Sequence, residues 1–324
     1  MLSLHKSFSY SRFIGKELKK NRERKQMVLF TGLTGTSGSA LVDVLQKHGF
    51  SEHFRVLVRK TSNLTQLENS GLDYETAYGS LNDAQSLVSA MTGCDTVFHI
   101  AAKGKLKEIA NAAVESKTVR KCILVSSTSV YSSYRKTSYL AEDEKIIKPL
   151  LEQNGISWVL IRPTMIYGTL EDRNISQFMK WIDKYPIFPL VKKGRALLQP
   201  VYRYDIAEAF YLLLTNRDAC NCEEFIVSGK EPLSLKELLE TIGASLGKKT
   251  RFINVPFWAA QGGVNILYYL SRKKVDFREK LFRLTEDRAF DHTAISERFG
   301  YEPGTFEEGV SQLSALYKNR EKKQ

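Results

Sequence analysis

Short apolar runs recur along the first half of the chain, separated by glycines, polar turns and stretches of helical character. The runs predict buried strands at 28–31, 54–58, 73–78, 96–100, 121–125 and 158–162, because strands of a parallel sheet are covered on both faces. Between them, helices are predicted, as at 105–116. This alternation favours an α/β fold in which a doubly wound parallel sheet forms a Rossmann domain.

The pattern changes at Thr169, beyond which helices with short irregular links predominate. We therefore expect a Rossmann domain at 27–168 and a smaller, mostly helical substrate domain at 169–324. A segment at about 197–215 is expected to return to the main sheet. Residues 1–26 are interpreted as a basic, disordered extension or as the result of a mis-assigned start, since Met27 directly precedes the first strand; a targeting or membrane-surface segment is the alternative.

Two helix starts in the second half are marked by residues that favour capping. Ser234 is followed three positions later by Glu237, the spacing of a capping box. Asp205 is expected to be the N-cap of the helix that follows it, and not a catalytic group.

The first strand leads directly into a Gly-x-x-Gly-x-x-Gly segment that opens a helix. Gly32 permits the tight turn, Gly35 lets backbone approach a pyrophosphate, and Gly38 allows the helix to pack closely on the strand. The free N–H groups at the helix N-terminus favour an anion. Glycine triplets alone are weak evidence, but the flanking strand and helix make dinucleotide binding the favoured interpretation.

The ends of the next strands refine this prediction. Arg59 follows the second strand, where an arginine suits the 2′-phosphate of NADP(H), although a solvated charge is the alternative. Ala101 and Ala102 are small enough for a flat cofactor to lie against backbone, and His99 before them is expected to be a core residue. NADP is therefore preferred over NAD, and the candidate cofactor-binding residues are Gly32, Thr34, Gly35, Thr36, Ser37, Gly38, Arg59, Ser80, Leu81, Ala101, Ala102 and Pro163.

Charge and composition narrow the function classes. The net charge of +12 lies largely in the basic ends of the 324-residue chain, and no nucleic-acid motif accompanies it, so no nucleic-acid partner is expected. No apolar run is long enough to span a bilayer; the nearest, 252–270, is interrupted by polar residues and is expected to be a helix packed in the small domain, with a membrane-surface role left open. Four cysteines without metal spacing suggest no metal site and a reducing, cytoplasmic location.

Four segments together resemble the short-chain dehydrogenase/reductase superfamily, of the extended or atypical type that includes the NAD-dependent epimerase/dehydratase family. They are TGLTGTSG, VFHIAA, VSSTSVY and RPTMIYG, and the resemblance extends from about Met27 to FGYEPGTFEEGV. These motifs are specific for the fold but not for a substrate.

The resemblance implies a mechanism in which a serine and a tyrosine flank the substrate's carbonyl or carbinol, and a lysine four residues after the tyrosine lowers its pKa. The serine corresponds to Ser127 and the tyrosine to Tyr139. Asp143 stands where the lysine should be, and a carboxylate there is expected to raise the phenol pKa. Tyr131 is a less favoured alternative to Tyr139.

The leading hypothesis is an NAD(P)-dependent oxidoreductase or epimerase/dehydratase-type enzyme with a small-molecule substrate, such as a nucleotide-sugar. The missing lysine favours the alternative, an NAD(P)-binding regulator or assembly factor without turnover. Arg173, Lys193 and Arg203 are candidates for binding a substrate phosphate or carboxylate. Analogy with the extended members suggests a homodimer.

Overall fold

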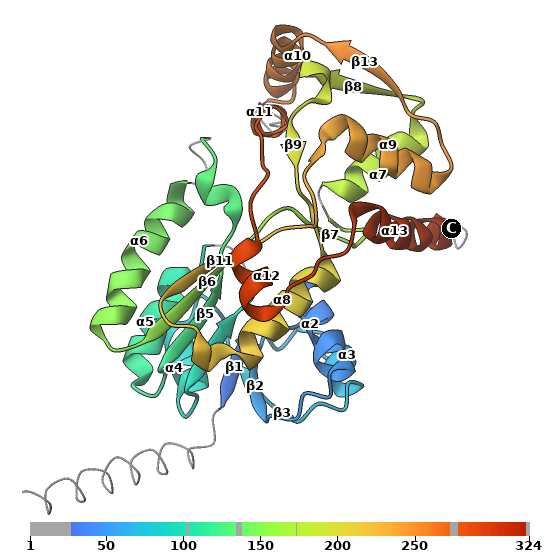
Figure 1. Ribbon diagram of the computed structural model, residues 1–324. Coiled ribbons are helices and arrows are strands. Elements are labelled where there is room, and N and C mark those ends of the chain that lie inside the picture. The colour runs from blue at the N-terminus through green and yellow to red at the C-terminus, as the bar shows by residue number, and fades with distance from the viewer. Residues whose placement is uncertain (1–26, 102–103, 134–137, 173, 273–277, 322–324) are drawn as a thin grey trace, which may run out of the picture.

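The computed structural model describes residues 27–101, 104–133, 138–172, 174–272 and 278–321. Its centre is a seven-stranded, all-parallel sheet of order β11-β6-β5-β4-β1-β2-β3 (Figure 1). The strands are β1 (Val28–Thr31), β2 (Phe54–Val58), β3 (Tyr74–Tyr78), β4 (Thr96–His99), β5 (Lys121–Val125), β6 (Ser157–Pro163) and β11 (Glu223–Val227). The six predicted strands are confirmed to within one residue at each end, and so is the doubly wound fold.

Helices cover both faces of the sheet (Figure 1). Phe30 points to a core shared with α2 and α8, whereas its neighbour Leu29 points to a core shared with α4, α5 and α6. The helices of the first layer are α2 (Thr36–Lys47), α3 (Thr65–Glu68), α8 (Arg203–Thr215) and α12 (Thr293–Phe299), and those of the second are α4 (Ala84–Met91), α5 (Leu106–Ser116) and α6 (Ser138–Gln153). Because neighbouring strand residues face opposite sides, the apolar runs of the sequence fill both cores.

His99 is fully buried at the end of β4, as expected of a core residue. Its Nδ1 lies 2.7 Å from Oγ1 of Thr31 on the neighbouring strand β1. The hydrogen bond joins the two strands directly behind the glycine segment.

The chain returns to the Rossmann domain over a longer stretch than 197–215. Helix α8 packs against α2, and β11 then adds the edge strand beside β6. Asp205 is not the N-cap of α8: that residue is Tyr202, and Asp205 lies within the first helical turn. Its carboxylate instead accepts hydrogen bonds from the backbone N–H groups of Gly304 and Tyr202. The prediction was wrong because an N-cap is defined by its extended backbone, and Tyr202 has it.

A third core lies in the small domain, between α7 (Ile175–Lys184), α9 (Leu235–Leu246) and α13 (Phe306–Glu321). The capping box of α9 is confirmed, with Ser234 as N-cap and Glu237 returning its hydrogen bond. Three strand pairs complete the domain: β7 (Ile166–Tyr167) with β10 (Val201–Tyr202), β9 (Leu197–Leu198) with β12 (Leu233–Ser234), and β8 (Ile187–Val191) with β13 (Arg251–Val255). Short 3-10 turns are η1 (Thr128–Tyr131), η3 (Lys192–Gly194) and η4 (Arg217–Ala219).

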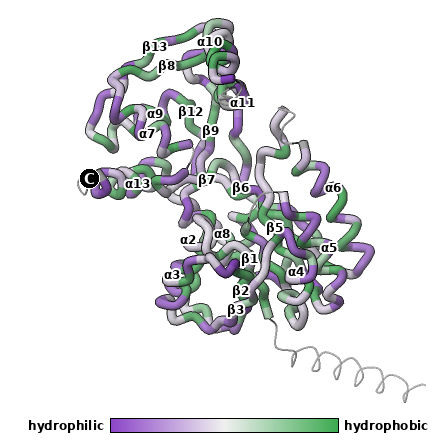
Figure 2. The backbone as a smooth tube through the Cα atoms, turned by 180° about the vertical axis from the view of Figure 1, so that it is seen from behind, coloured by the Kyte–Doolittle hydropathy of each residue, from purple (hydrophilic) through white to green (hydrophobic). Residues whose placement is uncertain are grey.

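The region 252–270 is not one packed helix. Pro256 separates β13 from α10 (Phe257–Leu270), and α11 (Arg278–Arg283) follows. None of the fourteen residues of α10 is buried, although the helix is among the most hydrophobic segments outside the sheet (Figure 2). No helix within the described residues is long and apolar enough to cross a membrane.

Candidate functional site

A cavity of about 530 Å³ opens at the carboxyl ends of β1 to β4. Such an edge is where open α/β sheets bind ligands. The lining residues come from the glycine segment and three strand ends: Thr31, Gly32, Thr34, Gly35, Thr36, Ser37, Gly38, Leu57, Val58, Arg59, Ser62, Gly79, Ser80, Leu81, Asn82, Ile100, Ala101 and Lys105. Ten of the twelve predicted cofactor-binding residues are therefore brought together here.

The glycine segment needs its glycines for steric reasons. Gly32 has a φ of +89°, and a Cβ at this position would lie 2.6 Å from the backbone nitrogen of Ala101. A Cβ on Gly38 would lie 2.1 Å from the carbonyl oxygen of Gly32. Gly35 is the N-cap of α2 and offers no side chain to the helix, which leaves the first N–H groups of α2 free to bind a phosphate.

Arg59 is exposed at the end of β2 and lines the same cavity as Ser62. The two residues form a turn in which the Arg59 N–H donates to Oγ of Ser62, at 3.1 Å, and the Ser62 N–H donates to the Arg59 carbonyl. The turn brings a guanidinium and a hydroxyl to one rim of the cavity. Ser62 was missed in the sequence, where only its spacing from Arg59 could have revealed it.

Two predicted cofactor residues lie elsewhere. Ala102 falls outside the described residues, and Pro163 lines a second cavity, at the ends of β5 and β6. Lys105 was not predicted, yet it lines the first cavity and forms an ion pair with Glu108, with 2.7 Å between Nζ and Oε1.

The second cavity has a volume of about 560 Å³ and lies between the sheet and the small domain. Its floor comes from the strand ends, and its walls come from α7, β9 and the region of α11. The lining residues are Ser127, Pro163, Thr164, Met165, Ile166, Asn174, Gln177, Phe178, Leu198, Glu279, Arg283, Leu284 and Arg288.

Hydroxyl groups lie at the floor of this second cavity. Ser127 has 4 % of its surface exposed and is the N-cap of η1, with its Oγ accepting the N–H of Ser129 at 3.2 Å. Thr164 is also buried, and its Oγ1 has no hydrogen-bond partner among the described residues. A buried hydroxyl without a partner is costly, so Thr164 is suited to a polar ligand group.

Two arginines form the cationic side of the second cavity. Arg283 is held by Glu279, with 3.3 Å between Nη1 and Oε1, whereas Arg288 has no ion-pair partner among the described residues. Burial, together with the charge of Arg283, lowers the pKa of Arg288 to about 10. Two adjacent guanidinium groups favour a ligand with phosphate or carboxylate oxygens.

Tyr139 stands at the start of α6 and is about half exposed. Its ring lies so close to Gly104 that a Cβ there would be 3.1 Å from Cε2 of Tyr139. Tyr139 lines neither cavity among the described residues, which do not include 134–137 immediately before it.

Asp143 is buried one turn further along α6 and forms an ion pair with Lys107 of α5, with 2.8 Å between Oδ1 and Nζ. The hydrogen bond with Asp143 raises the pKa of Lys107. The carboxylate at the position of the family lysine is therefore paired with a lysine from another helix.

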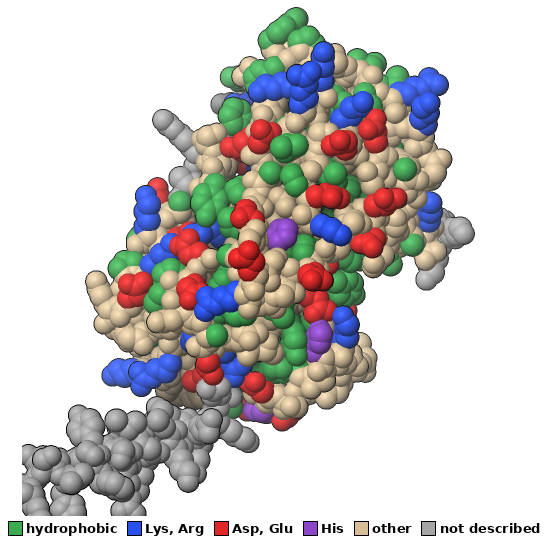
Figure 3. All heavy atoms as spheres, viewed as in Figure 1, with side chains coloured by type: hydrophobic (Ala, Val, Ile, Leu, Met, Phe, Trp, Pro, Cys, Tyr) green, Lys and Arg blue, Asp and Glu red, His purple; other side chains and the backbone are tan. Residues whose placement is uncertain are grey.

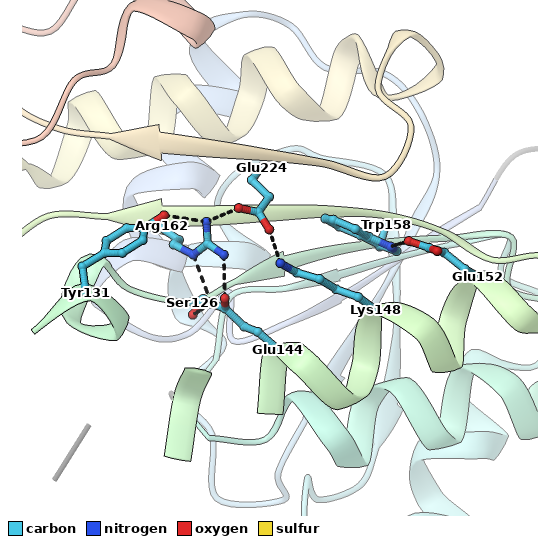
Figure 4. Close-up of polar contacts among 8 residues, drawn as sticks. All are labelled: Ser126, Tyr131, Glu144, Lys148, Glu152, Trp158, Arg162 and Glu224. Atoms are coloured by element: carbon cyan, nitrogen blue, oxygen red, sulfur yellow. Dashed lines mark hydrogen bonds and ion pairs between the residues drawn. The ribbon is translucent and has the colours of Figure 1, made fainter. Parts of the chain in front are cut away.

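The alternative tyrosine, Tyr131, belongs to a different cluster (Figure 4). Its hydroxyl accepts from Nη1 of Arg162, at 3.0 Å, and its ring packs against Phe290. Arg162 is buried in β6 and also forms ion pairs with Glu144, at 2.6 Å, and Glu224, at 2.5 Å. Tyr131 is about half exposed, at the edge of the ionic network centred on the buried Arg162, and it lines neither of the two cavities.

The sequence candidates for a substrate anion lie outside the second cavity. Arg203 donates to Oγ of Ser39 and lies over the ring of Tyr204. Lys193 lines a separate cavity beside α10, and Arg173 is outside the described residues. Arg283 and Arg288 were missed because only the fold brings them to Ser127. The described residues contain no cluster of three or more potential metal ligands.

The family model for NAD(P)H-binding domains matches residues 32–180. A ketoreductase of Stigmatella aurantiaca, which acts on a farnesylated quinoline oxide, is 23 % identical over 73 % of this chain and 78 % of its own. The N-acetyl-α-D-glucosaminyl-diphospho-ditrans,octacis-undecaprenol 4-epimerase of Escherichia coli O157:H7 is 25 % identical over 88 % and 93 %. Among solved structures, the dTDP-glucose 4,6-dehydratase of Streptomyces venezuelae with NAD bound has a TM-score of 0.69 at 19 % identity, covering 92 % of this chain and 98 % of its own.

The parallel sheet, the glycine segment and the first cavity define an NAD(P)-binding protein of the Rossmann type. Its relatives along most of the chain are reductases, epimerases and dehydratases. Residues 32–180 thus form an NAD(P)H-binding family domain, and the relatives and structural neighbours along most of the chain agree with the resemblance to extended short-chain dehydrogenases/reductases.

Proposed function

We propose that this protein is an NAD(P)-dependent enzyme that acts on a carbonyl or carbinol of a sugar carrying a diphosphate. The observation that carries the proposal is the second cavity, which combines the buried Ser127 with Arg283 and Arg288. It opens at the same edge of the sheet as the cofactor cavity. A hydride acceptor, a polar group for the reacting oxygen and a cationic wall for the diphosphate are thereby available together.

The cofactor, when bound, supplies or accepts the hydride. In the proposed reaction Ser127 binds the reacting oxygen, and the phenol of Tyr139 donates or accepts its proton. The partnerless hydroxyl of Thr164 is a further candidate for binding the sugar. For the proton transfer, the Tyr139 side chain would have to turn so that its phenol lies beside Ser127.

Within NAD(P), we propose a preference for NADP(H). The guanidinium of Arg59 and the hydroxyl of Ser62 lie on the cavity rim beside the end of β2. An arginine at this position suits a 2′-phosphate, and β2 ends with no carboxylate that would bind a 2′-hydroxyl instead.

The substrate class is proposed from the two arginines. A diphosphate is common to nucleotide-sugars and to lipid-linked sugars, and both kinds of substrate occur in the names of similar proteins. A carbonyl compound without a diphosphate is the competing substrate class, because one relative is named as a ketoreductase of such a compound.

The second candidate is an NAD(P)-binding regulator without turnover. Asp143 favours this candidate, because it stands four residues after Tyr139, where a lysine would lower the pKa of the phenol. Its carboxylate is instead paired with Lys107.

Fluorescence titration with NADPH and NADH, followed by a panel of diphosphate sugars and simple ketones, tests these proposals. Oxidation of bound NADPH by a sugar, or interconversion of sugar epimers, supports the enzyme, and Tyr139→Phe should then abolish turnover while cofactor affinity is kept. Tight cofactor binding without turnover across the panel contradicts the enzyme and favours the regulator.

Two further features are proposed by analogy. The chain is expected to form a homodimer, for which exposed Ile146 on α6 offers an apolar contact, and light scattering would measure its mass. The four unpaired thiols, of which three are buried, suit a reducing location such as the cytoplasm.

A further inference from the structure

Helix α10 lies at the outer end of the small domain (Figures 1 and 2). Several of its large apolar side chains are exposed to solvent. We call these residues, with one from β13, the apolar outer face: Ile253, Trp258, Ile266, Leu267, Tyr269 and Leu270. Trp258 is 76 % exposed and Leu270 is 78 % exposed. An apolar helix in which no residue is buried lacks the partner that such a helix normally packs against.

Basic residues are concentrated in the segments next to this face. From 247 to 275 the sequence contains six lysines and arginines and no acidic residue. We call the exposed basic residues of η3, of the β13 segment and of the end of α10 the basic rim: Lys192, Lys193, Arg195, Lys249, Arg251 and Arg272. Figure 3 shows lysine and arginine side chains in a band directly beneath the apolar tip, with acidic side chains further away.

Part of the rim forms a cavity at the start of α10. Lys192, Lys193 and Arg195 line it together with Pro256 and Phe257. The backbone N–H of Lys193 donates to Oδ1 of Asn254, at 3.0 Å, which fixes η3 against β13. Asp287 also lines the cavity, but its Oδ1 accepts the N–H of Leu197.

We propose that the apolar outer face and the basic rim bind the surface of an anionic lipid bilayer. Aromatic and aliphatic side chains on an interfacial helix enter the headgroup region, and flanking lysines and arginines contact anionic headgroups. The cationic cavity gives one headgroup phosphate a place beside the helix N-terminus.

Charge favours the bilayer over a second copy of the chain. A twofold dimer would place the same patch on both subunits, and the basic rims would then face each other. Like charges across an interface cost free energy, whereas an anionic surface neutralises the whole rim at once.

Binding would bring the second cavity close to the membrane. Helix α11 contributes Arg283 to that cavity and packs against α10, with Arg278 lying over the ring of Tyr268 at 3.8 Å. The inference itself is independent of the reaction, because it rests only on the outer face and the rim.

The test is sedimentation of the full chain with vesicles of phosphatidylcholine alone or mixed with phosphatidylglycerol. The protein should bind the mixed vesicles more tightly, and salt should weaken binding. Trp258→Ser/Leu270→Ser should reduce the partition coefficient at least about tenfold. The matched control Tyr78→Ser/Leu316→Ser removes exposed apolar side chains elsewhere and should leave binding unchanged.

Charge is tested separately. Lys193→Ala/Arg251→Ala should weaken binding to the mixed vesicles about fivefold per residue, whereas Lys117→Ala/Arg120→Ala, far from α10, should not. If the first 26 residues were the membrane-binding element, the Trp258→Ser/Leu270→Ser and Lys193→Ala/Arg251→Ala variants would both bind like the original chain, and the proposal would be wrong.

Fluorescence locates the contact. In a Trp181→Phe background the exposed tryptophan of the described residues is Trp258, while Trp158 is buried. Mixed vesicles should shift the emission to shorter wavelength, and lipids brominated on their chains should quench it. No binding to mixed vesicles, no change at Trp258, or a dimer that dissociates in Trp258→Ser/Leu270→Ser would each overturn the proposal.

Discussion

Asp143 of α6 and Lys107 of α5 form an ion pair one helical turn from Tyr139, with 2.8 Å between Oδ1 and Nζ. The carboxylate therefore does not face Tyr139 as an isolated negative charge. The pair also links α6, which carries Tyr139 as the proposed proton donor, to α5. This arrangement makes the pH dependence of any turnover the most direct test of the unusual aspartate.

Asp143→Lys should shift the pH optimum of turnover downwards. A lysine at this position places an ammonium group one turn from the phenol, which stabilises the phenolate and lowers its pKa. The measurement is a pH profile of kcat for the original chain and the variant.

Two companions separate charge from packing. Asp143→Asn removes the negative charge without adding a cation, and should give a smaller shift. Lys107→Asp/Asp143→Lys restores an ion pair, so it keeps the helices together while retaining the new ammonium group. If all three profiles coincide with the original, Asp143 has no influence on the proton donor.

Arg59→Asp should weaken NADPH binding far more than NADH binding. The change removes the charge that suits a 2′-phosphate and adds an acceptor for a 2′-hydroxyl. We expect NADPH affinity to fall on the order of 100-fold, since a charge-assisted contact contributes about 1.5–3 kcal/mol and a repulsive charge is added. Ser62→Ala should give a smaller change in the same direction, and equal losses for both cofactors would refute the role of Arg59.

The Rossmann half of the fold could be predicted because its signals are local. The run 54–58 is β2 without any shift, and the Ser234 capping box needs only residues within one turn. The cofactor cavity was predictable for the same reason, since parallel strands end at one edge and bring Gly32, Arg59 and Ala101 together.

The substrate cavity could not be predicted to the same depth. Arg288 lines the same cavity as Ser127 because Leu198 of β9 forms a bridge with Arg288, and no local pattern in the sequence encodes that placement. The region 252–270 was expected to be packed because it is apolar, but hydropathy does not say whether the fold supplies a partner. The role of Tyr139 as proton donor stays a prediction, because Tyr139 lines neither of the two cavities.

Arg288→Gln should raise KM for a diphosphate sugar about tenfold or more while kcat changes little. The guanidinium is remote from the hydride-transfer end in the proposed reaction, so its loss removes binding energy common to the ground and transition states. Steady-state kinetics checks this, with Arg320→Gln, at an exposed position of α13, as the control. A fall in kcat with unchanged KM would mean that Arg288 acts on the reacting groups instead.

Arg162→Met should lower the free energy of unfolding by about 3–5 kcal/mol, because it leaves Glu144 buried without its cation. Ser126 would still donate to Glu144, at 2.5 Å, but a hydroxyl does not balance a full charge. Arg162→Met/Glu144→Gln should recover part of the loss. Denaturant unfolding gives the free energy of unfolding of the original chain, the single variant and the double variant. If the double variant loses as much stability as Arg162→Met alone, the loss does not come from the unpaired charge of Glu144.

Asp205→Asn should become progressively more stabilising, relative to the original chain, between about pH 4 and pH 6. Burial raises the pKa of Asp205 to about 6 in the folded protein, above the ordinary value near 3.9 of an unfolded aspartate. Between these values the folded chain holds the proton more tightly, so the original chain loses stability as pH rises through this window, and the asparagine does not. We expect a difference on the order of 1–2 kcal/mol after solvent screening.

Glu224→Gln provides the control of opposite sign. The hydrogen bond with Arg162 lowers the pKa of Glu224 to about 2, so the original carboxylate gains stability as pH rises from about 2 to 4.5. The glutamine variant should therefore fall behind the original chain over that lower window, whereas Asp205→Asn moves ahead over the higher one. Unfolding free energies across pH 3 to 7 distinguish the two, and a flat difference for Asp205→Asn would show that its carboxyl ionises normally.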